Sequence, residues 1–343
     1  MSVAISYLSG LNVVKLGRIA GQFAKPRSSP FEKGPSGEQL PSFRGDIINS
    51  DEMTREARTP DPERIIRAYS QSASSLNMLR ALAKSTTGML DWVELISRLA
   101  PDSYRSFVEQ IEDALAFTTA CGLDAGASSE CASPSFYTSH EALLLPYEQA
   151  LTRPHVDKVT GDTVYYCTSA HMLWVGERTR QLDSAHLEFL RGLQNPLGAK
   201  IGPSVQPDEL LQLIDTLNPT NKDGQLTLIV RMGADKIRSN LPKLVRAVKN
   251  EGRNVVWSID AMHGNTIKVA SGLKTRPFET ILSEIDSFFS IHDAEGTIAG
   301  GVHLEMTGDE HVTECLGGSV AKITEDKLID NFKSACDPRL NGT

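Results

Sequence analysis

The sequence predicts an α/β protein of the (β/α)8 barrel type, in which parallel strands alternate with covering helices. From Ala170 onward, short β-branched runs alternate with amphipathic helix patterns, as in repeated strand–helix units on a parallel sheet. Polar or charged residues follow nearly every run, and barrels place their functional groups at that end of each strand. The 343 residues, 40% hydrophobic and 23% charged, can bury one large core, so we expect a single domain over residues 1–343.

Seven runs are predicted to be strands of this sheet. Short β-branched runs that are bounded by turn-forming residues are typical of strands. The first two runs lie far apart in the sequence, and the other five are separated by helix-length intervals. The predicted strands are residues 11–16, 134–137, 171–175, 199–202, 226–230, 254–259 and 300–304.

Helix patterns fill the intervals between the runs. Residues 207–217 begin with a proline, which suits the first turn of a helix. In residues 241–248 and 278–291, apolar residues recur at the spacing of one helix face. A long helical stretch covers residues 62–120, and its later part, about residues 89–120, is predicted to be an insertion of extra helices between early strands.

Three segments are predicted to be loops because Pro, Ser, Gly and charged residues dominate them. Residues 25–58 form the longest of the three, and loops of that length within a domain are usually functional or mobile. Residues 121–132 and 152–163 are predicted to be surface loops. No short-period repeat accompanies the strand–helix alternation.

The overall composition excludes several classes of protein. A formal net charge of −8 argues against a nucleic-acid or anionic-membrane surface, because such surfaces usually carry a basic excess that neutralises phosphates. The five cysteines form no CxxC pair and are widely spaced, which favours a reducing compartment over a disulfide scaffold. No stretch approaches the roughly 20 apolar residues of a membrane span. We therefore expect a cytoplasmic protein with no membrane partner and no nucleic-acid partner.

Basic residues gather at the predicted strand ends. In an otherwise acidic protein, such a cluster suits substrates with phosphate and carboxylate groups, which guanidinium groups bind through two parallel hydrogen bonds. Taken singly, an Arg or Lys after a strand often only reaches solvent or pairs with a helix. The predicted cluster comprises Arg18, Lys25, Arg27, Arg178, Lys200 and Arg231.

One histidine and two carboxylates near later strand ends form a second candidate group, His263, Glu305 and Asp337. One nitrogen ligand with two oxygen ligands suits a site for Mn²⁺, Fe²⁺, Co²⁺ or Zn²⁺ better than it suits a thiolate-rich zinc site. The spacing alone is a weak signal, because ligands that are distant in sequence show no pattern without the fold. His186 and His303 are equally available by composition, and a histidine near a strand is often packed and hydrogen-bonded instead.

The predicted strand ends lie within longer sequence phrases. These are GRIAGQFAKPRS (17–28), FRGD (43–46), TSHEAL (138–143), WVGERTRQ (174–181), RMG (231–233), MHGNT (262–266), VTECLGG (312–318) and CDPRLN (336–341). They occur in one order from about residue 11 to residue 341, and so many long phrases in order are highly specific. On these phrases the chain resembles the class II 3-deoxy-D-arabino-heptulosonate-7-phosphate (DAHP) synthases.

The resemblance implies a metal-dependent transferase that joins phosphoenolpyruvate to erythrose 4-phosphate and water, giving DAHP and phosphate. This is the first step of the shikimate pathway, which leads to chorismate and the aromatic amino acids. The implied fold is a TIM barrel and the implied assembly is a homo-oligomer in the cytoplasm, or in a plastid where a transit peptide has been lost. The implied cofactor is a divalent metal, manganese first, with Co²⁺, Zn²⁺ or Fe²⁺ as alternatives.

The resemblance also implies roles for individual residues. Phosphoenolpyruvate would be bound by Arg18, Glu177, Arg178, Lys200 and Arg231. The sugar phosphate, and the junction between the substrates, would be served by Lys25, Arg27 and Ser28. The metal would be bound by His263, Glu305 and Asp337. Catalysis would involve Lys25, Arg27, Lys200 and His263.

The chain departs from the family's pattern in its first part. In the family, a fourth metal ligand is a cysteine in a Gly-Asp-Cys-Ala-Glu phrase on the first barrel strand, and no such phrase exists here. With seven predicted strands, we expect a barrel that lacks its first strand and its last helix, and that binds metal weakly with little turnover. A truncated, noncatalytic homologue or a partner subunit is therefore the alternative function. Ala261, where the family usually has proline, is a minor departure.

Overall fold

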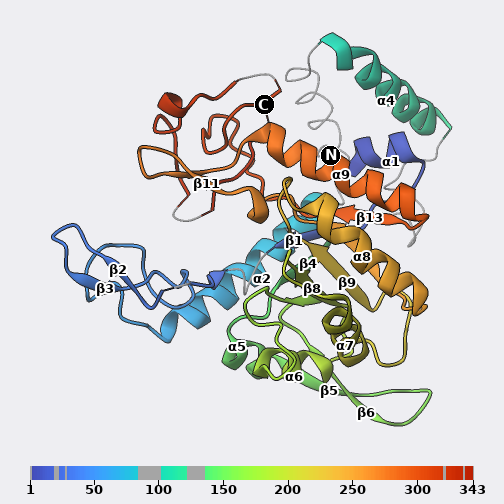
Figure 1. Cartoon of the computed structure of the whole chain (residues 1–343), viewed down its shortest axis with the longest axis horizontal. Helices are drawn as coiled ribbons and strands as arrows, with labels where there is room; N and C mark the ends of the chain where they lie inside the picture. Colours follow the sequence, from blue (N-terminus) through green and yellow to red (C-terminus); the bar gives the residue numbers. More distant parts are fainter. Residues whose placement is uncertain are drawn as a thin grey trace.

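The structure, a computed structural model, describes residues 2–18, 23–27, 29–83, 102–121, 136–319, 322–334 and 337–342. Its centre is a parallel sheet, in which seven strands of these residues follow one another in chain order (Figure 1). Each predicted run overlaps one of these strands, so the predicted parallel sheet is confirmed. The strands are β1 (Lys15–Arg18), β4 (Phe136–Glu141), β7 (Met172–Val175), β8 (Leu197–Ile201), β9 (Leu226–Val230), β10 (Val256–Ile259) and β13 (Ala299–Val302).

The sheet curls like part of a barrel. Within the described residues, β1 and β13 are its two edges. Arg18 at the end of β1 nevertheless reaches Glu305, shortly after β13, with 2.7 Å between Nη1 and Oε1. An ion pair of this length requires the sheet to curve until the carboxyl ends of its outermost strands meet. The coarse prediction of a barrel-like α/β fold is therefore confirmed.

Four helices follow the later strands and pack against one another in sequence around the sheet (Figure 1). Their apolar faces meet the strands in one core, where Leu213, Leu228, Leu244 and Phe288 are completely shielded from solvent. Burying a large apolar side chain of this kind contributes about 1.5–3 kcal/mol. The helices are α6 (Ala185–Arg191), α7 (Pro207–Leu217), α8 (Ile237–Asn250) and α9 (Phe278–Glu295).

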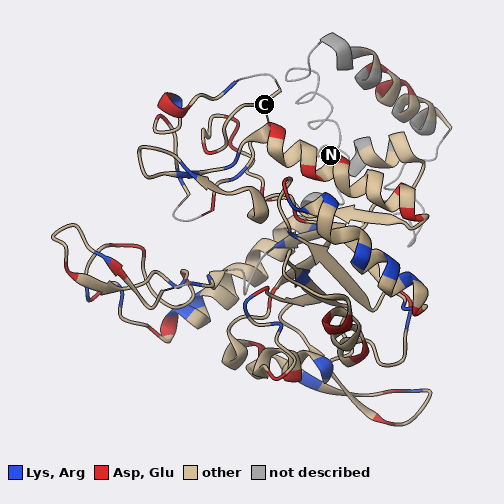
Figure 2. Cartoon of the chain, viewed as in Figure 1, with Lys and Arg blue, Asp and Glu red and all other residues tan. Residues whose placement is uncertain are grey.

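The predicted helices match these elements closely. α7 has the predicted bounds, and α8 extends beyond the predicted segment at both ends. α9 continues past residue 291 and ends at Gly296, whose φ of 61° is a left-handed conformation that favours glycine. Charge lies on the outer faces, with acidic bands on α7 and basic bands on α8 (Figure 2). Exposed charges of this kind keep the helices solvated and add little stability singly.

Residues 29–62 extend away from the sheet (Figure 1). The predicted long loop, residues 25–58, contains a small hairpin of β2 (Phe31–Lys33) and β3 (Gln39–Pro41). Arg58, only 2% exposed, fixes this hairpin by pairing with Glu32. The loop is therefore a folded extension with its own buried ion pair.

Helices follow this extension. They include α2 (Glu63–Ala83) and α4 (Asp102–Ala120), while α1 (Ser2–Ser9) precedes β1 and α5 (Leu145–Ala150) follows β4. Of the predicted helical insertion, residues 102–120 form α4 and residues 89–101 lie outside the described part of the chain. None of the described helices combines the length and apolar character that crossing a membrane would need.

The prediction of a surface loop at residues 152–163 was wrong. This segment forms most of an antiparallel hairpin of β5 (Thr152–Val156) and β6 (Thr163–Cys167), which projects from the sheet (Figure 1). The polar composition belongs to its turn, where Asp157 Oδ1 accepts the backbone N–H groups of Val159 and Thr160. The other predicted surface loop, beyond Cys121, lies outside the described residues.

His292 makes the stability of this fold depend on pH. Its ring is fully buried on α9, 4.5 Å from the Phe288 ring, and burial lowers its pKa from 6.5 to about 4. Between about pH 4 and pH 6.5, His292 therefore binds a proton in the unfolded chain but not in the folded chain. The stability that the neutral ring contributes is complete above pH 6.5 and is lost as the pH falls toward 4.

We expect the His292→Asn variant to lose less stability on acidification than the wild type does. Asn can keep the hydrogen bond to Thr297 without a group that titrates. Between neutral pH and pH 4, the wild type should lose up to about 3 kcal/mol more of its unfolding free energy than the variant. Denaturant unfolding at a series of pH values measures this difference, and parallel curves for the two proteins would contradict the assignment.

Candidate active site

A buried carboxylate, Asp260, organises the carboxyl ends of two strands. It follows β10 directly and is completely shielded from solvent. Its Oδ2 pairs with Lys200 Nζ from β8 and lies 2.8 Å from His263 Nδ1, while Oδ1 accepts the backbone N–H of Met262 at 3.1 Å. Burial opposes ionisation, yet His263 and Lys200 hold the pKa of Asp260 well below its usual range. Asp260 is therefore a fixed negative charge.

Asp260 sets the orientation of the His263 ring. With Nδ1 against Asp260, Nε2 faces the site and lies 3.6 Å from Glu305 Oε1. A histidine that ligates a metal commonly donates its other ring nitrogen to a carboxylate in this way. A nitrogen and a carboxylate oxygen at this separation could both be ligands of one cation.

Three candidate ligands meet at this point. One ligand atom from each of His263, Glu305 and Asp337 lies within 4.8 Å of the other two. Glu305 is 8% exposed, and although burial opposes its ionisation, His263, Arg18 and Arg276 keep its pKa far below the ordinary value. One nitrogen and two carboxylates are a donor set that fits a divalent first-row cation.

Arg276 connects the turns that carry these three residues. It is fully buried just before α9, and its Nη1 donates to Glu305 Oε2 at 2.6 Å and to the carbonyl oxygen of Pro338, the neighbour of Asp337. Its Nε donates to Thr266 Oγ1 at 3.0 Å, in the turn of His263. Arg276 thereby places Glu305 and both flanking turns in one arrangement.

Basic side chains surround the three candidate ligands. Arg18 pairs with Glu305, and Lys25 Nζ lies 3.5 Å from Asp337 Oδ2. Arg231 Nη2 donates to the His263 carbonyl oxygen at 3.5 Å. The structure therefore brings Arg18, Lys25, Lys200 and Arg231 of the predicted cluster to the candidate ligands or their immediate partners.

Trp174 lies beneath two of these cations. Its ring centroid is 5.7 Å from the Arg18 guanidinium carbon and 5.5 Å from Lys200 Nζ. Trp174 belongs to β7 and is 2% exposed. A cation over an aromatic face is attracted to it electrostatically, which helps to hold the side chain in position.

The other predicted site residues have different partners. Arg178 Nη1 donates to the Pro26 carbonyl oxygen at 3.2 Å, so it lies against the segment that carries Lys25. Arg27 pairs with Glu32 of the β2–β3 hairpin at 2.8 Å, away from the candidate ligands. Glu177 pairs with Arg180 at 3.0 Å. Ser28 lies outside the described residues.

Another carboxyl group lies at the same rim of the sheet. Glu141 ends β4, and burial raises its pKa against the opposing effects of Lys200, His263, Arg18 and Arg178. The carboxylate lies close to Gly176, where an added Cβ would be 2.0 Å from Glu141 Oε1 and the side chain would have to move. Burial therefore makes Glu141 easier to protonate than an exposed carboxyl group.

Sequence analysis missed several of these residues. Asp260 directly follows a predicted strand, so the criterion that selected Arg231 would have found it. Glu141 follows the second predicted strand by four residues and lies in the phrase TSHEAL, but it was given no role. Trp174 lies in a phrase that was used only for the family resemblance. Arg276 has no such signal, because it lies between a short hairpin and a helix and only the fold brings it to Glu305.

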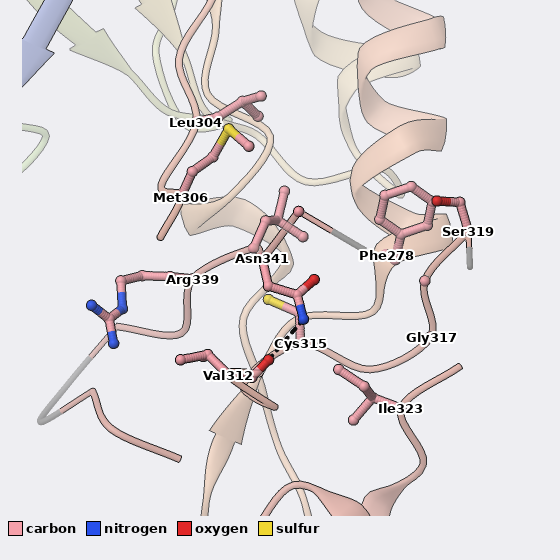
Figure 3. A pocket seen from close by; sticks show the side chains of 13 residues that line it. Phe278, Leu304, Met306, Val312, Cys315, Gly317, Ser319, Ile323, Arg339 and Asn341 are labelled. Atoms are coloured by element: carbon pink, nitrogen blue, oxygen red, sulfur yellow. Dashed lines mark hydrogen bonds between the residues drawn. The ribbon is translucent and has the colours of Figure 1, made fainter. Parts of the chain in front are cut away.

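A cavity of about 230 Å³ lies among the segments that follow β13 and the start of α9 (Figure 3). Leu304 and Met306, the neighbours of Glu305, line one side of it, and Phe278 lines another. Asn341 Nδ2 donates to the Val312 carbonyl oxygen at 2.8 Å across its wall. None of the three candidate ligands lines this apolar cavity, so we place the chemistry at the strand ends instead.

The chain is similar in sequence to known proteins. A family model described as the class-II DAHP synthetase family matches residues 1–343. A protein of Streptomyces coelicolor named phospho-2-dehydro-3-deoxyheptonate aldolase is 48% identical over 349 residues, covering 99% of this chain and 75% of that protein. A protein of Neurospora crassa with the same name is 45% identical over 359 residues, covering 99% of this chain and 73% of that protein.

The contacts of Asp260 predict its effect on metal binding. Asp260→Asn preserves the shape but removes the charge that fixes the His263 ring and neutralises Lys200. We expect the affinity for a divalent cation to fall about 10- to 100-fold, as for other partners of metal ligands. Titration of the purified protein with Mn²⁺ measures this affinity. Asp215→Asn, an exposed carboxylate paired with Arg253, is the control, and equal affinities in both variants would contradict the role of Asp260.

Proposed function

The chain belongs to the class-II DAHP synthetase family, and from this membership we infer that it is a 3-deoxy-7-phosphoheptulonate synthase. This transferase condenses phosphoenolpyruvate with erythrose 4-phosphate and water, giving DAHP and inorganic phosphate at the start of the shikimate pathway. The family match over residues 1–343 carries this conclusion. The comparisons give no support to the alternative of a noncatalytic homologue or partner subunit.

We assign the metal to His263, Glu305 and Asp337, whose donor atoms converge and whose charges suit a divalent cation. Manganese is the proposed ion, with Co²⁺, Zn²⁺ and Fe²⁺ as alternatives. When bound, the cation supplies Lewis-acid polarisation of the erythrose 4-phosphate aldehyde. Asp260 and Arg276 would keep His263 and Glu305 in place for it.

The phosphoenolpyruvate subsite would lie over Trp174. Arg18 and Lys200 already lie against this ring, and Arg231 lies at the neighbouring strand end. Together with Arg178, these cations can neutralise a phosphate and a carboxylate through charge-assisted hydrogen bonds. Glu177, paired with Arg180, would border the same subsite.

The erythrose 4-phosphate subsite would lie between the metal and the β2–β3 hairpin. Lys25 contacts Asp337, so it is within reach of a substrate beside the candidate ligands. Arg27 would exchange its pairing with Glu32 for the sugar phosphate. Ser28 completes the proposed set by resemblance alone.

In the reaction, carbon 3 of phosphoenolpyruvate forms a bond to the aldehyde carbon of erythrose 4-phosphate. The aldehyde oxygen takes up a proton, water adds its oxygen at carbon 2, and the bond from carbon 2 to the phosphate oxygen breaks. Lys200, which pairs with Asp260, would supply a proton to the aldehyde oxygen, and His263, fixed by the same carboxylate, would take part as a metal ligand. The remaining cations orient both substrates, and positioning with fixed charge supplies most of the rate enhancement.

Assembly, domain organisation and compartment are further proposals. By resemblance, we expect one barrel domain per chain, association into a homo-oligomer, and residence in the cytoplasm or a plastid. Light scattering on the purified protein measures the mass in solution and tests the assembly directly.

Activity should depend on a divalent cation. After treatment with a chelator, we expect synthase activity to disappear, and we expect Mn²⁺ or Co²⁺ to restore it best because the ligands are one nitrogen and two carboxylates. Release of phosphate from the two substrates is the measurement. Full turnover in a sample shown to be free of metal would contradict the assignment of the three ligands.

The role proposed for Arg231 gives a second prediction. Arg231→Ala should raise the KM for phosphoenolpyruvate by about 10- to 100-fold, since it leaves substrate charge without a partner. The KM for erythrose 4-phosphate should change much less. Arg253→Ala, at the opposite end of β10, is a matched control that should leave both constants unchanged. Wild-type kinetics for Arg231→Ala would show that Arg231 does not bind the substrate.

A further inference from the structure

A second buried carboxylate, Glu284, reaches the site from the side of the helices. It lies on α9 and is fully shielded from solvent. Its Oε1 accepts the backbone N–H of Gly233 at 2.7 Å and that of Met232 at 3.1 Å. These two residues directly follow Arg231, so the carboxylate fixes the turn that carries this cation.

The other oxygen of Glu284 reaches the turn of His263. Oε2 accepts from Asn265 Nδ2 at 2.6 Å, and the same amide nitrogen donates to the Ala261 carbonyl oxygen at 2.7 Å. Asn265 Oδ1 accepts the backbone N–H of Ala234 at 3.0 Å. Glu284 and Asn265 thereby connect the turn after β9 to the turn after β10 through side chains alone.

The two turns also touch through their glycines. A Cβ added at Gly264 would lie 2.4 Å from the Gly233 nitrogen, so only a residue without a side chain permits this contact. Gly233 itself has a φ of 89°, in the left-handed region that glycine adopts without strain. The turns therefore pack backbone to backbone, and the carboxylate of Glu284 lies beneath both.

The burial and hydrogen bonds of the Glu284 carboxyl group indicate a role beyond filling space in the core. Burial raises the pKa of Glu284 to about 7 even though three hydrogen bonds favour its ionised form. Burying a carboxyl group costs free energy unless its oxygens accept hydrogen bonds. The oxygens of Glu284 accept them from two backbone N–H groups and from Asn265, so the same contacts offset that cost and satisfy donors of both turns.

We propose that Glu284, acting through Asn265, is a positioning residue that sets Arg231 and His263 at a fixed separation. This inference rests on the proposed function, in which Arg231 binds phosphoenolpyruvate and His263 binds the metal. One buried link would then determine the geometry of both subsites. Loss of the link should weaken metal binding and phosphoenolpyruvate binding together, whereas loss of Arg231 alone should affect mainly the substrate.

The test compares Glu284→Gln with the wild-type enzyme. The glutamine oxygen can still accept from Met232 and Gly233, but its amide group turns a donor toward the Asn265 donor and breaks that contact. We expect the Kd for Mn²⁺ and the KM for phosphoenolpyruvate each to rise about 10-fold or more. Metal titration, steady-state kinetics and thermal unfolding are measured on the same preparations.

Two further variants separate positioning from stability. Phe288→Leu, one turn along α9 in the core, should lower the melting temperature while leaving the Kd for Mn²⁺ and the KM unchanged. Asn265→Ala should reproduce the paired loss, and Glu284→Gln combined with Asn265→Ala should be no worse than either single variant, because both remove one link.

The outcomes are distinct. The proposal is overturned if Glu284→Gln and Asn265→Ala lower the melting temperature but, like Phe288→Leu, leave both binding constants at wild-type values. Fully additive losses in the double variant would also overturn it. If the wild-type enzyme neither binds Mn²⁺ nor forms DAHP, the proposed function fails first and the positioning role fails with it.

Discussion

The carboxylate of Glu305 is the group on which the geometry of the site depends. Arg18 from the first strand of the sheet, His263 after β10 and Arg276 before α9 all converge on it. Only a strongly curled sheet brings residues so distant in sequence to one point, and the ion pairs in turn connect the two edges of that sheet. The fold and the candidate metal site are therefore stabilised by the same contacts, because a buried carboxylate needs compensating cations wherever it lies.

Pairing of opposite charges extends through the whole site. Lys200 pairs with Asp260 and Lys25 with Asp337, so cations assigned to the substrates contact the candidate ligands or the carboxylate that orients one of them. Such pairs keep an acidic chain with a net charge of −8 from accumulating unbalanced positive charge at one rim. They also mean that substrate anions and a metal cation would act on the same groups, so the binding of one should influence the binding of the other.

Much of this arrangement could be predicted from the sequence, because strands and their ends have local signals. The β-branched runs predicted every strand of the central sheet within a few residues, and the polar residues at their ends include Arg18, Lys200 and Arg231. The hairpin that contains residues 152–163 was predicted to be a loop because the polar residues of its turn dominate the composition of that segment. Arg276 and Glu284 could not be predicted as site residues because neither lies at a strand end. Only tertiary packing brings their side chains to the site.

We propose that His263, Glu305 and Asp337 together bind one divalent cation. The most direct measurement is the stoichiometry of Mn²⁺ bound per chain, determined by electron paramagnetic resonance of the free ion for the wild type and for Glu305→Gln. Glu310→Gln, an exposed carboxylate on the same segment, is the matched control. We expect one ion bound per chain in the wild type and the control, and none in Glu305→Gln. An unchanged stoichiometry and affinity in Glu305→Gln would contradict it.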